Sequence, residues 1–324
     1  MADKDRGYIV TEMKKGVVLT WGGGVPRGEN VPGRIRQMEH VLWLDQDVGP
    51  GNFYSECLWF YPPSMVHPEE KTKMEQFRKS RKPTDPPVGP QPHAHPFDEV
   101  FAFFGSNYDD PKDLCGEMEF WLEDKEFVFD KSCIVYIPAG LKHCPLVTRK
   151  IDKPIFHFSL GISPTYQHKL LSGPGKYAGT DCSKYFIYDD KPNLKLPEYR
   201  REPSKELATR VVYLDSEVLP GANFNSEALW FWPGERPTSR PGGKNGVEAH
   251  SHPFPELIGF FGTDENNINE LCGEVEFYID GKQHLVTKSF LAVIPAGIEH
   301  CPLNIRRLDR PVFAFTVGHA PMYE

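Results

Sequence analysis

The chain has 324 residues and a net charge of −8, and 13% of its residues are aromatic. This length excludes a small disulfide scaffold and is sufficient for two hydrophobic cores. The acidic balance argues against nucleic acid as a partner, and no apolar stretch approaches the roughly 18 residues that a membrane-spanning helix needs. Because the chain starts without an apolar leader and has seven cysteines, an odd number, we expect a cytoplasmic protein with free thiols and no membrane partner.

In chain order, the N-terminal half predicts a series of short β-strands. They are rich in β-branched and aromatic residues and are separated by Gly, Pro and Asp. They are expected at 41–45, 56–62, 99–105, 116–122, 126–129, 133–138 and 154–160. Between 63 and 92, the density of charge and proline predicts an exposed loop with one short helix. No stretch carries a sustained helical period, so we predict an all-β fold.

The second half of the chain repeats the first. Residues 93–158 align without a gap on residues 250–315 at a constant offset of 157, and HAHPFDEVFAFFG matches HSHPFPELIGFFG. Upstream blocks recur at offsets of 170 and 171. The duplication predicts two antiparallel β-barrels or sandwiches in tandem. The expected segments are an N-terminal arm at 1–37, a first domain at 38–162, a linker at 163–207 with a strand at 184–188, and a second domain at 208–324.

Each copy contains residues suited to bind a metal ion. Alternate residues on a strand face the same way, so His93 and His95 present two imidazoles on one face. Pro96 turns the chain and brings Glu99 back on an adjoining strand, and a P-x-G-x-x-H turn supplies His143. The second copy offers His250, His252, Glu256 and His300. Three imidazoles and one carboxylate suit Fe, Mn, Ni, Co, Cu or Zn and leave coordination positions open.

For any single histidine, there is a simpler alternative to metal binding, because a histidine more often packs in a core or lies at the surface than binds a metal. Here, six of the twelve histidines fall in two constellations with the same spacing. A metal site is therefore the favoured interpretation.

These motifs resemble a known superfamily. H-x-H-x3-E followed by P-x-G-x-x-H is similar to the two motifs of the cupins. The duplication resembles the bicupins, which include oxalate decarboxylases, ring-cleaving dioxygenases and seed storage proteins. The resemblance implies a double-stranded β-helix, or jelly-roll, barrel for each half, with one divalent transition metal ion per domain, iron favoured, on the eight residues named above. Ser132 and Ser289 depart from the second motif at its glycine. Bicupins associate through sheet edges, so a homodimer is compatible with the resemblance.

The resemblance implies a metal-dependent enzyme that acts on a small organic substrate, because storage cupins lack these ligands. An iron-dependent dioxygenase is favoured, since a redox metal can bind substrate and O2 at adjacent open positions. The alternative is a metal-dependent decarboxylase, lyase or isomerase. No arginine stands just before either H-x-H pair, where oxalate decarboxylase would hold its dicarboxylate. A metal-loaded sensor or binding module without turnover is a third hypothesis.

Two further residues are candidates for catalysis. His157 lies in the strand at 154–160 opposite Ala314 of the second copy, and it is either a pocket base or an ordinary packing histidine. Glu248 precedes His250 by two residues, so it is either an acid or base that faces the same cavity or an exposed side chain.

Two repeated pairs carry expectations about packing. Glu56 and Glu227 lie in apolar strands and need partners, for which the repeated Arg149 and Arg306 are the expected cations. Cys144 and Cys301 follow ligand histidines, so strand alternation predicts that their thiols point away from the metal.

Overall fold

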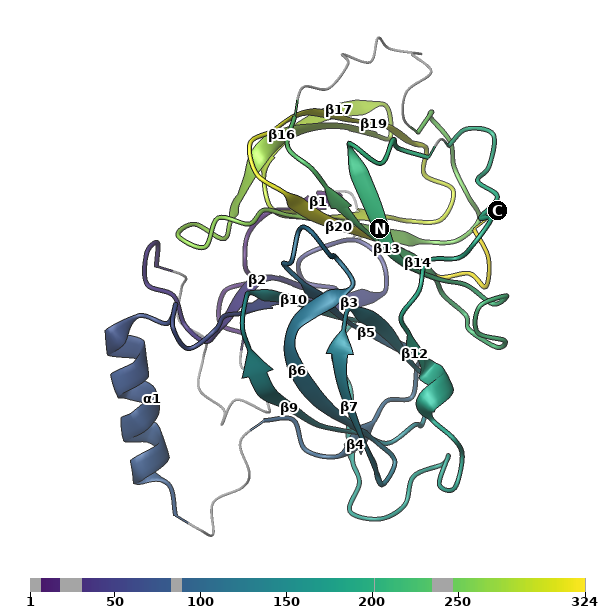
Figure 1. Cartoon of the computed structure of the whole chain (residues 1–324). Coiled ribbons are helices and arrows are strands. Elements are labelled where there is room, and N and C mark those ends of the chain that lie inside the picture. Colours follow the sequence, from purple (N-terminus) through teal and green to yellow (C-terminus); the bar gives the residue numbers. More distant parts are fainter. Residues whose placement is uncertain (1–6, 18–30, 83–88, 201, 235–246, 324) are drawn as a thin grey trace.

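The predicted strands form two similar sets, one in each half of the chain, which lie on top of one another in Figure 1. This computed structural model describes residues 7–17, 31–82, 89–200, 202–234 and 247–323. Most strands are buried over nearly their whole length, in keeping with their apolar sequences. The predicted fold class, an all-β chain with two tandem jelly-roll barrels, is confirmed.

The N-terminal barrel consists of two antiparallel sheets. One has the strand order β12-β8-β5-β10-β3-β2, and the other has the order β11-β4-β9-β6-β7. Its strands are β2 (Met38–Leu44), β3 (Phe53–Phe60), β4 (His93–Ala94), β5 (Glu99–Gly105), β6 (Asp113–Leu122), β7 (Lys125–Lys131), β8 (Cys133–Ile137), β9 (His143–Ile151), β10 (Ile155–Ile162), β11 (Lys169–Leu170) and β12 (Phe186–Ile187). The 3-10 helix η2 (Ser183–Tyr185) leads into β12.

The C-terminal barrel repeats this arrangement. Its sheets have the orders β1-β18-β15-β20-β14-β13 and β17-β16-β19. Its strands are β13 (Ala208–Leu214), β14 (Asn225–Phe231), β15 (Glu256–Phe261), β16 (Glu270–Ile279), β17 (Lys282–Lys288), β18 (Phe290–Ile294), β19 (His300–Leu308) and β20 (Val312–Gly318), together with β1 (Ile9–Val10). Strands that correspond in sequence therefore hold corresponding places in the two barrels.

Two short strands from the segments that precede the barrels cover equivalent sheet edges, and the first of them crosses to the other half. β1 lies in the segment that precedes the first barrel, but it pairs with β18 of the C-terminal barrel, Ile9 opposite Ala292. β12 lies in the segment that precedes the second barrel, but it pairs with β8 of the N-terminal barrel, Phe186 opposite Val135. Val135 and Ala292 are themselves 157 residues apart, so the two strands occupy equivalent edges. The strand predicted at 184–188 is thus found at Phe186–Ile187.

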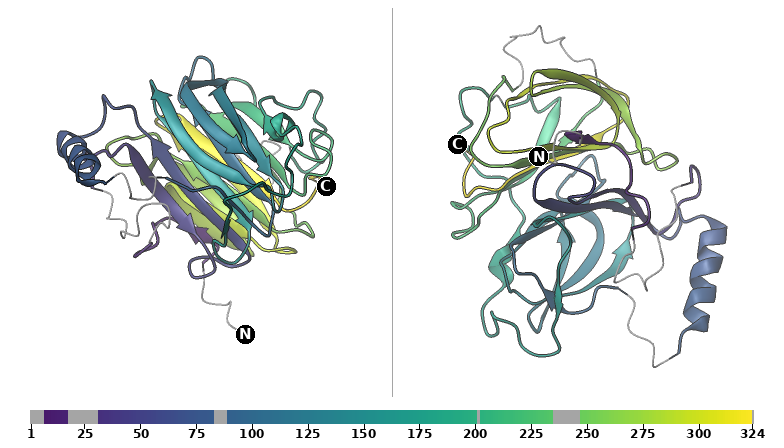
Figure 2. Two further views of the ribbon diagram at one scale, coloured as in Figure 1. Left: turned by 90° about the horizontal axis from the view of Figure 1, so that it is seen from below. Right: turned by 180° about the vertical axis from the view of Figure 1, so that it is seen from behind.

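The two larger sheets pack face to face, as Figure 2 shows from below. Alternate residues of β10 and β20 meet across this interface: the rings of Phe158 and Phe315 are stacked with centroids 3.9 Å apart, and Phe156 contacts Phe313 at 4.8 Å. Trp59 and Trp230 lie against these rings. One apolar cluster therefore includes residues of both barrels.

Helix α1 (Pro68–Ser80) is the short helix predicted between 63 and 92, and it extends away from the barrels (Figure 1). Glu69 and Glu70 in its first turn and Arg78 and Lys79 in its last turn complement the helix dipole. None of its residues is buried. The helices of the described chain fall short of the length and apolar character that crossing a bilayer requires.

Candidate metal centres and the cavity of the C-terminal barrel

The structure brings the four predicted ligands of the N-terminal barrel together. His93 on β4 pairs across the strands with His143, the first residue of β9, and the two ring centroids are 4.2 Å apart. His95 follows β4, and Glu99 begins β5. The glycine of the P-x-G-x-x-H turn, Gly140, has a φ of +85° and donates its N–H to the carbonyl of His95 at 2.9 Å. This turn therefore holds the second and fourth ligands in one arrangement.

Hydrogen bonds fix the orientation of the three imidazoles. The Nδ1 of His93 contacts the carbonyl of Gln91 at 2.6 Å, and that of His143 contacts the carbonyl of Leu141 at 3.0 Å. The Nδ1 of His95 contacts the carbonyl of Gln167. A carbonyl only accepts, so each Nδ1 carries the hydrogen and each Nε2 presents a lone pair. Burial lowers the pKa of His93 to about 3, that of His95 to about 2 and that of His143 to about 4, so all three are neutral at pH 7.

The free atoms of this cluster fit a metal ion. The Oε2 of Glu99 lies 3.2 Å from the Nε2 of His95 and 3.3 Å from that of His143. Within the described part of the chain, these nitrogens and both carboxylate oxygens are buried without a well-formed hydrogen bond. Burial also raises the pKa of the Glu99 carboxyl well above its ordinary value. Buried polar atoms normally have partners, and a divalent cation would satisfy all of these at once.

The C-terminal barrel repeats the arrangement. His250 and His300 are joined by two backbone hydrogen bonds, and the Oε2 of Glu256 lies 3.3 Å from the Nε2 of His252 and 3.4 Å from that of His300. The Nδ1 atoms of the three histidines contact the carbonyls of Glu248, Phe254 and Ile298. Gly297 has a φ of +78° and donates to the carbonyl of His252. In this barrel, the possible ligand atoms of His252, Glu256 and His300 lie within 4.8 Å of one another, and those of His250 and His300 lie equally close together with that of Cys301.

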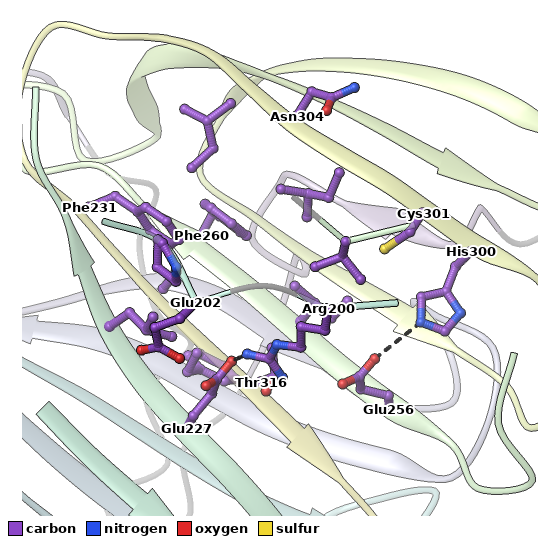
Figure 3. Close-up of a pocket in the computed structure, with 18 of the residues that line it drawn as sticks. Arg200, Glu202, Glu227, Phe231, Glu256, Phe260, His300, Cys301, Asn304 and Thr316 are labelled. Carbon is purple, nitrogen blue, oxygen red and sulfur yellow. Dashed lines mark ion pairs between the residues drawn. The ribbon is translucent and has the colours of Figure 1, made fainter. Parts of the chain in front are cut away.

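A cavity of about 480 Å³ leads to the C-terminal set from inside the barrel (Figure 3). Its walls include Leu229, Phe231, Ile258, Phe260 and Ala314. His250, Glu256, His300 and Tyr323 also line it. Arg200, from the segment between the barrels, extends into the cavity beside Glu227. This volume is within the range of pockets that bind small organic molecules.

Each jelly-roll barrel thus holds three histidines and one glutamate, which come from the same two motifs. The fold is a bicupin fold. No protein-family model matches the chain, and no curated protein matches it.

Several solved structures are similar to this chain over most of its length. AerE from Microcystis aeruginosa is 12% identical with a TM-score of 0.45, over 89% of this chain and 96% of that one. The oxalate decarboxylase of Lactobacillus farciminis, in its formate complex, is 13% identical with a TM-score of 0.49, over 93% and 89% of the two chains. The oxalate decarboxylase of Bacillus subtilis, studied for its Mn(II) centres, is 12% identical with a TM-score of 0.49, over 92% and 80%.

The interior of the N-terminal cupin barrel is filled where the C-terminal one is open. Phe101 replaces Ile258, and His157 replaces Ala314. The His157 ring is stacked on Phe103 with centroids 4.5 Å apart and lies 5.3 Å from that of Phe101. Its Nδ1 contacts the carbonyl of Ala102 at 2.9 Å, and burial lowers its pKa to about 4. His157 therefore lies among packed rings, as the alternative interpretation expected, and a catalytic role for it stays a prediction.

The buried glutamates have partners other than the expected arginines. Glu56 contacts His40, and Glu227 contacts both Arg200 and Arg210. His40 and Arg210 hold equivalent positions on β2 and β13. The expectation of Arg149 and Arg306 was wrong, because these residues lie on β9 and β19 in the other sheets. They form ion pairs there with Glu119 and Glu276, among others.

The expectation for the second cysteine also fails. The Sγ of Cys301 lies within 4.8 Å of ring nitrogens of His250 and His300, and Cys301 lines the cavity. Strand alternation predicted the opposite, but Cys301 has a φ of +70°, and this left-handed conformation interrupts the alternation. Burial raises the pKa of this thiol, so it is a protonated neighbour of the site at neutral pH.

Glu248 contributes its backbone rather than its carboxylate to the observed site. Its carbonyl receives the Nδ1 of His250 at 2.8 Å, while its side chain is exposed. A catalytic role for the Glu248 carboxylate stays a prediction, but the acidic side chains that line the cavity are Glu202, Glu227 and Glu256.

Two tyrosines, one at each site, were not predicted from the sequence. The hydroxyl of Tyr166 lies 3.2 Å from the Nε2 of His93, and that of Tyr323 lies 3.1 Å from the Nε2 of His250. These tyrosines are also 157 residues apart. Extending the gapless alignment eight residues beyond its end would have found them.

Proposed function

We propose that this chain is a metal-dependent enzyme whose C-terminal barrel binds and converts a small organic anion, by a reaction of the decarboxylase, lyase or isomerase class. The observation that carries the proposal is the cavity of about 480 Å³ with apolar walls, which is also lined by the His250, Glu256 and His300 side chains and contains Arg200. His93, His95, Glu99 and His143 would hold a second ion in the N-terminal barrel.

A divalent ion held by His250, His252, Glu256 and His300 would act as a Lewis acid toward an oxygen atom of the substrate. The other functions belong to the side chains of the cavity. Arg200 is the one Arg or Lys among the described residues that line it, so it would bind the anionic group of the substrate. Glu227 and the ring of Tyr323 hold the guanidinium in place.

The apolar walls would bind the rest of the substrate and exclude water. Phe231 and Phe260 are stacked with centroids 5.6 Å apart and form one side, with Leu229 and Ile258 nearby. Charge interactions are stronger where water is excluded, so this lining would strengthen the contact between Arg200 and an anion.

An iron-dependent dioxygenase is the second candidate. It is favoured by the aromatic, water-excluding wall and by a ligand set that leaves coordination positions open for both substrate and O2. The two candidates differ in their products, because a dioxygenase adds both atoms of O2 to its substrate, whereas a decarboxylase releases CO2 and an isomerase conserves the mass.

The test combines metal loading with mass spectrometry. Protein purified without chelators is analysed for metals, loaded separately with Fe(II), Mn(II), Co(II) or Ni(II), and incubated with aryl and alkyl carboxylic acids. Loss of CO2 or an isomerised product without O2 uptake supports the proposal. O2 uptake with oxygenated product supports the second candidate instead, and binding without any product supports the sensor hypothesis.

Equivalent positions of the two barrels provide a matched pair of variants. Ala314→Phe fills the C-terminal cavity without altering a ligand, and we expect it to abolish turnover with full metal content. His157→Phe keeps the N-terminal interior filled, and we expect it to leave turnover unchanged. The reverse pattern would place the reaction in the N-terminal barrel and restore His157 as a catalytic candidate.

A further inference from the structure

The repeated tyrosines, Tyr166 and Tyr323, follow the last strand of each barrel. Each stands in a G-x-x-P-x-Y segment, with Gly161 and Pro164 in the first copy and Gly318 and Pro321 in the second. Tyr323 thus belongs to the same repeat as the metal ligands.

Both hydroxyls are directed at the same atom of the equivalent ligand. Tyr323 lies 3.1 Å from the Nε2 of His250, and Tyr166 lies 3.2 Å from the Nε2 of His93. The Nδ1 of each histidine already donates to a backbone carbonyl. The Nε2 therefore accepts, and the tyrosine hydroxyl donates.

A metal ion and the tyrosine hydroxyl would need the same lone pair. A neutral imidazole whose Nδ1 carries hydrogen has one lone pair, on Nε2, and that lone pair forms the bond to a metal. Metal binding therefore ends the hydrogen bond from Tyr323 to His250 and leaves a half-buried donor next to the ion. A half-buried hydroxyl that loses one partner favours another acceptor, which is either the hydroxyl of Tyr199, already hydrogen bonded with Tyr323, or an oxygen atom bound at the ion.

The surroundings of Tyr323 restrict where that acceptor can be. The ring is held between the Arg200 guanidinium, 5.4 Å from its centroid, and the rings of His252 and Phe254, each 6.0 Å away. Tyr323 lines the cavity that we propose for the substrate. The hydroxyl consequently has access to a ligand in the cavity without a change in the position of the ring.

We propose that Tyr323 is a catalytic residue of the C-terminal barrel, which donates a hydrogen bond to the oxygen atom, of substrate or water, that occupies the coordination position next to His250. This inference rests on the proposed metal site. The donor stabilises negative charge on that oxygen, as the donors of an oxyanion hole do. Tyr166 is its counterpart in a barrel whose interior is filled by Phe101 and His157.

The test uses Co(II) as a probe in the full-length chain. His95→Ala is included so that the Co(II) signal comes from the C-terminal site, and visible spectra are recorded against pH. Loss of a hydrogen bond to a charged oxygen corresponds to roughly one pH unit or more. Tyr323→Phe is therefore expected to raise the pKa of Co(II)-bound water by at least about one unit, while Tyr166→Phe leaves it unchanged.

Two outcomes overturn the inference and remain distinguishable. If Tyr323→Phe binds Co(II) normally with an unshifted water pKa, the hydroxyl has no role at the ion, although the metal site stands. If Tyr323→Phe loses Co(II) affinity more than tenfold, the tyrosine is a ligand and not a donor. Failure of the unmodified chain to bind Co(II) contradicts the proposed function itself.

A second pair of measurements guards against misfolding caused by His95→Ala. The same tyrosine variants are prepared in the otherwise unmodified chain, with both sites loaded. Ala314→Phe identifies the part of the Co(II) pH titration that comes from the C-terminal cavity, because it alters only that part. Tyr323→Phe must shift the same part of the titration, and Tyr166→Phe must leave it unchanged. A common shift in both variants would contradict an assignment to the C-terminal cavity.

Discussion

At the residue scale, each of the six histidines contacts a backbone carbonyl through Nδ1 and directs its Nε2 toward the other residues of its set. His95 and His252 are the second ligand in each barrel, and both lie 3.2–3.3 Å from the glutamate of their own set. Such support fixes the ring before the metal binds, so the loss of one imidazole removes a preformed ligand.

We predict that His95→Ala and His252→Ala each lower the metal content from about two ions to about one per chain, because three remaining ligands bind far more weakly. Elemental analysis after dialysis measures the content, and circular dichroism checks the fold. His284→Ala, on β17, is the control and should keep both ions. Full metal content in either ligand variant would refute the assignment of that ligand.

His157 predicts a dependence of stability on pH. Burial lowers its pKa to about 4 in the folded protein, against about 6.5 when it is unfolded. As the pH falls from 6.5 to 4, the unfolded chain takes up the proton first, so the folded state loses up to about 3 kcal/mol; below pH 4 both states are protonated and the loss stops. His157→Phe should abolish this part of the acid sensitivity.

Denaturant unfolding of the metal-free chain between pH 7 and 4 measures the effect as the difference between the two proteins. A parallel decline of both unfolding free energies would show that His157 is accessible to protons in the folded state. That result would favour the pocket-base interpretation over packing.

Strand alternation and the glycine turn are local rules, and they predicted that the histidines and the glutamate of each motif lie near one another, as the structure places them. That these eight residues bind metal ions stays a prediction. The partners of Glu56 and Glu227 could not be predicted in this way, because His40 and Arg200 reach them from other parts of the chain. The direction of the Cys301 side chain was predicted wrongly because the neighbouring sequence does not indicate the positive φ of this residue.

At the element scale, the least predictable feature is the placement of β1 and β12. Each is two residues long, which is too short for the alternation of apolar and polar residues that identifies a strand in the sequence. β1 precedes the N-terminal barrel but covers a sheet edge of the C-terminal one, and β12 precedes the C-terminal barrel but covers a sheet edge of the N-terminal one. From the order of the chain alone, the two strands were assigned to an arm and a linker. Both strands cover exposed edges, and β1 also ties the start of the chain to the C-terminal barrel.

Val10 and Ile187 allow this placement to be tested. Both are buried, and they occupy equivalent positions on β1 and β12. We predict that Val10→Asp, through an unpaired buried charge, costs about 3 kcal/mol and increases hydrogen exchange in β18, while Ile187→Asp does the same in β8. Mass spectrometry of exchanged peptides measures both.

Conservative variants serve as controls for this pair. Val10→Ile and Ile187→Val keep the apolar character and should each change stability by less than about 1.5 kcal/mol. If Val10→Asp instead increases exchange in the strands of the N-terminal barrel alone, β1 does not pair with β18 in solution.

At the scale of the whole molecule, duplication has produced two barrels that share a ligand set and differ in their interiors. The fold class was predictable because the repeat and the strand pattern cover nearly the whole chain. In the sequence, the difference between a filled and an open interior shows only as His157 in the first copy opposite Ala314 in the second. The structure is needed to see that Phe101 and Phe103 pack around His157 and fill the N-terminal interior. We interpret one barrel as a structural support and the other as the site of substrate binding.

The barrels also share a core, which leads to a prediction about how they unfold. Phe158 is fully buried and is stacked on Phe315 of the other barrel, so it belongs to both. We predict that Phe158→Ala costs about 3–5 kcal/mol, the usual range for a buried phenylalanine, and lowers the protection of β10 and β20 together. Phe120→Ala, which removes a ring packed on Phe101 inside the N-terminal barrel, should have a similar cost but leave β20 protected.

Hydrogen exchange at matched denaturant concentrations separates these results. Equal loss of protection in both barrels for Phe120→Ala would mean that the chain unfolds as one unit. Loss confined to β10 for Phe158→Ala would mean that the aromatic interface contributes little to the C-terminal barrel. The expected contrast follows from the geometry, because Phe120 of β6 packs on Phe101 inside the N-terminal barrel, whereas Phe158 of β10 packs on Phe315 of the C-terminal barrel.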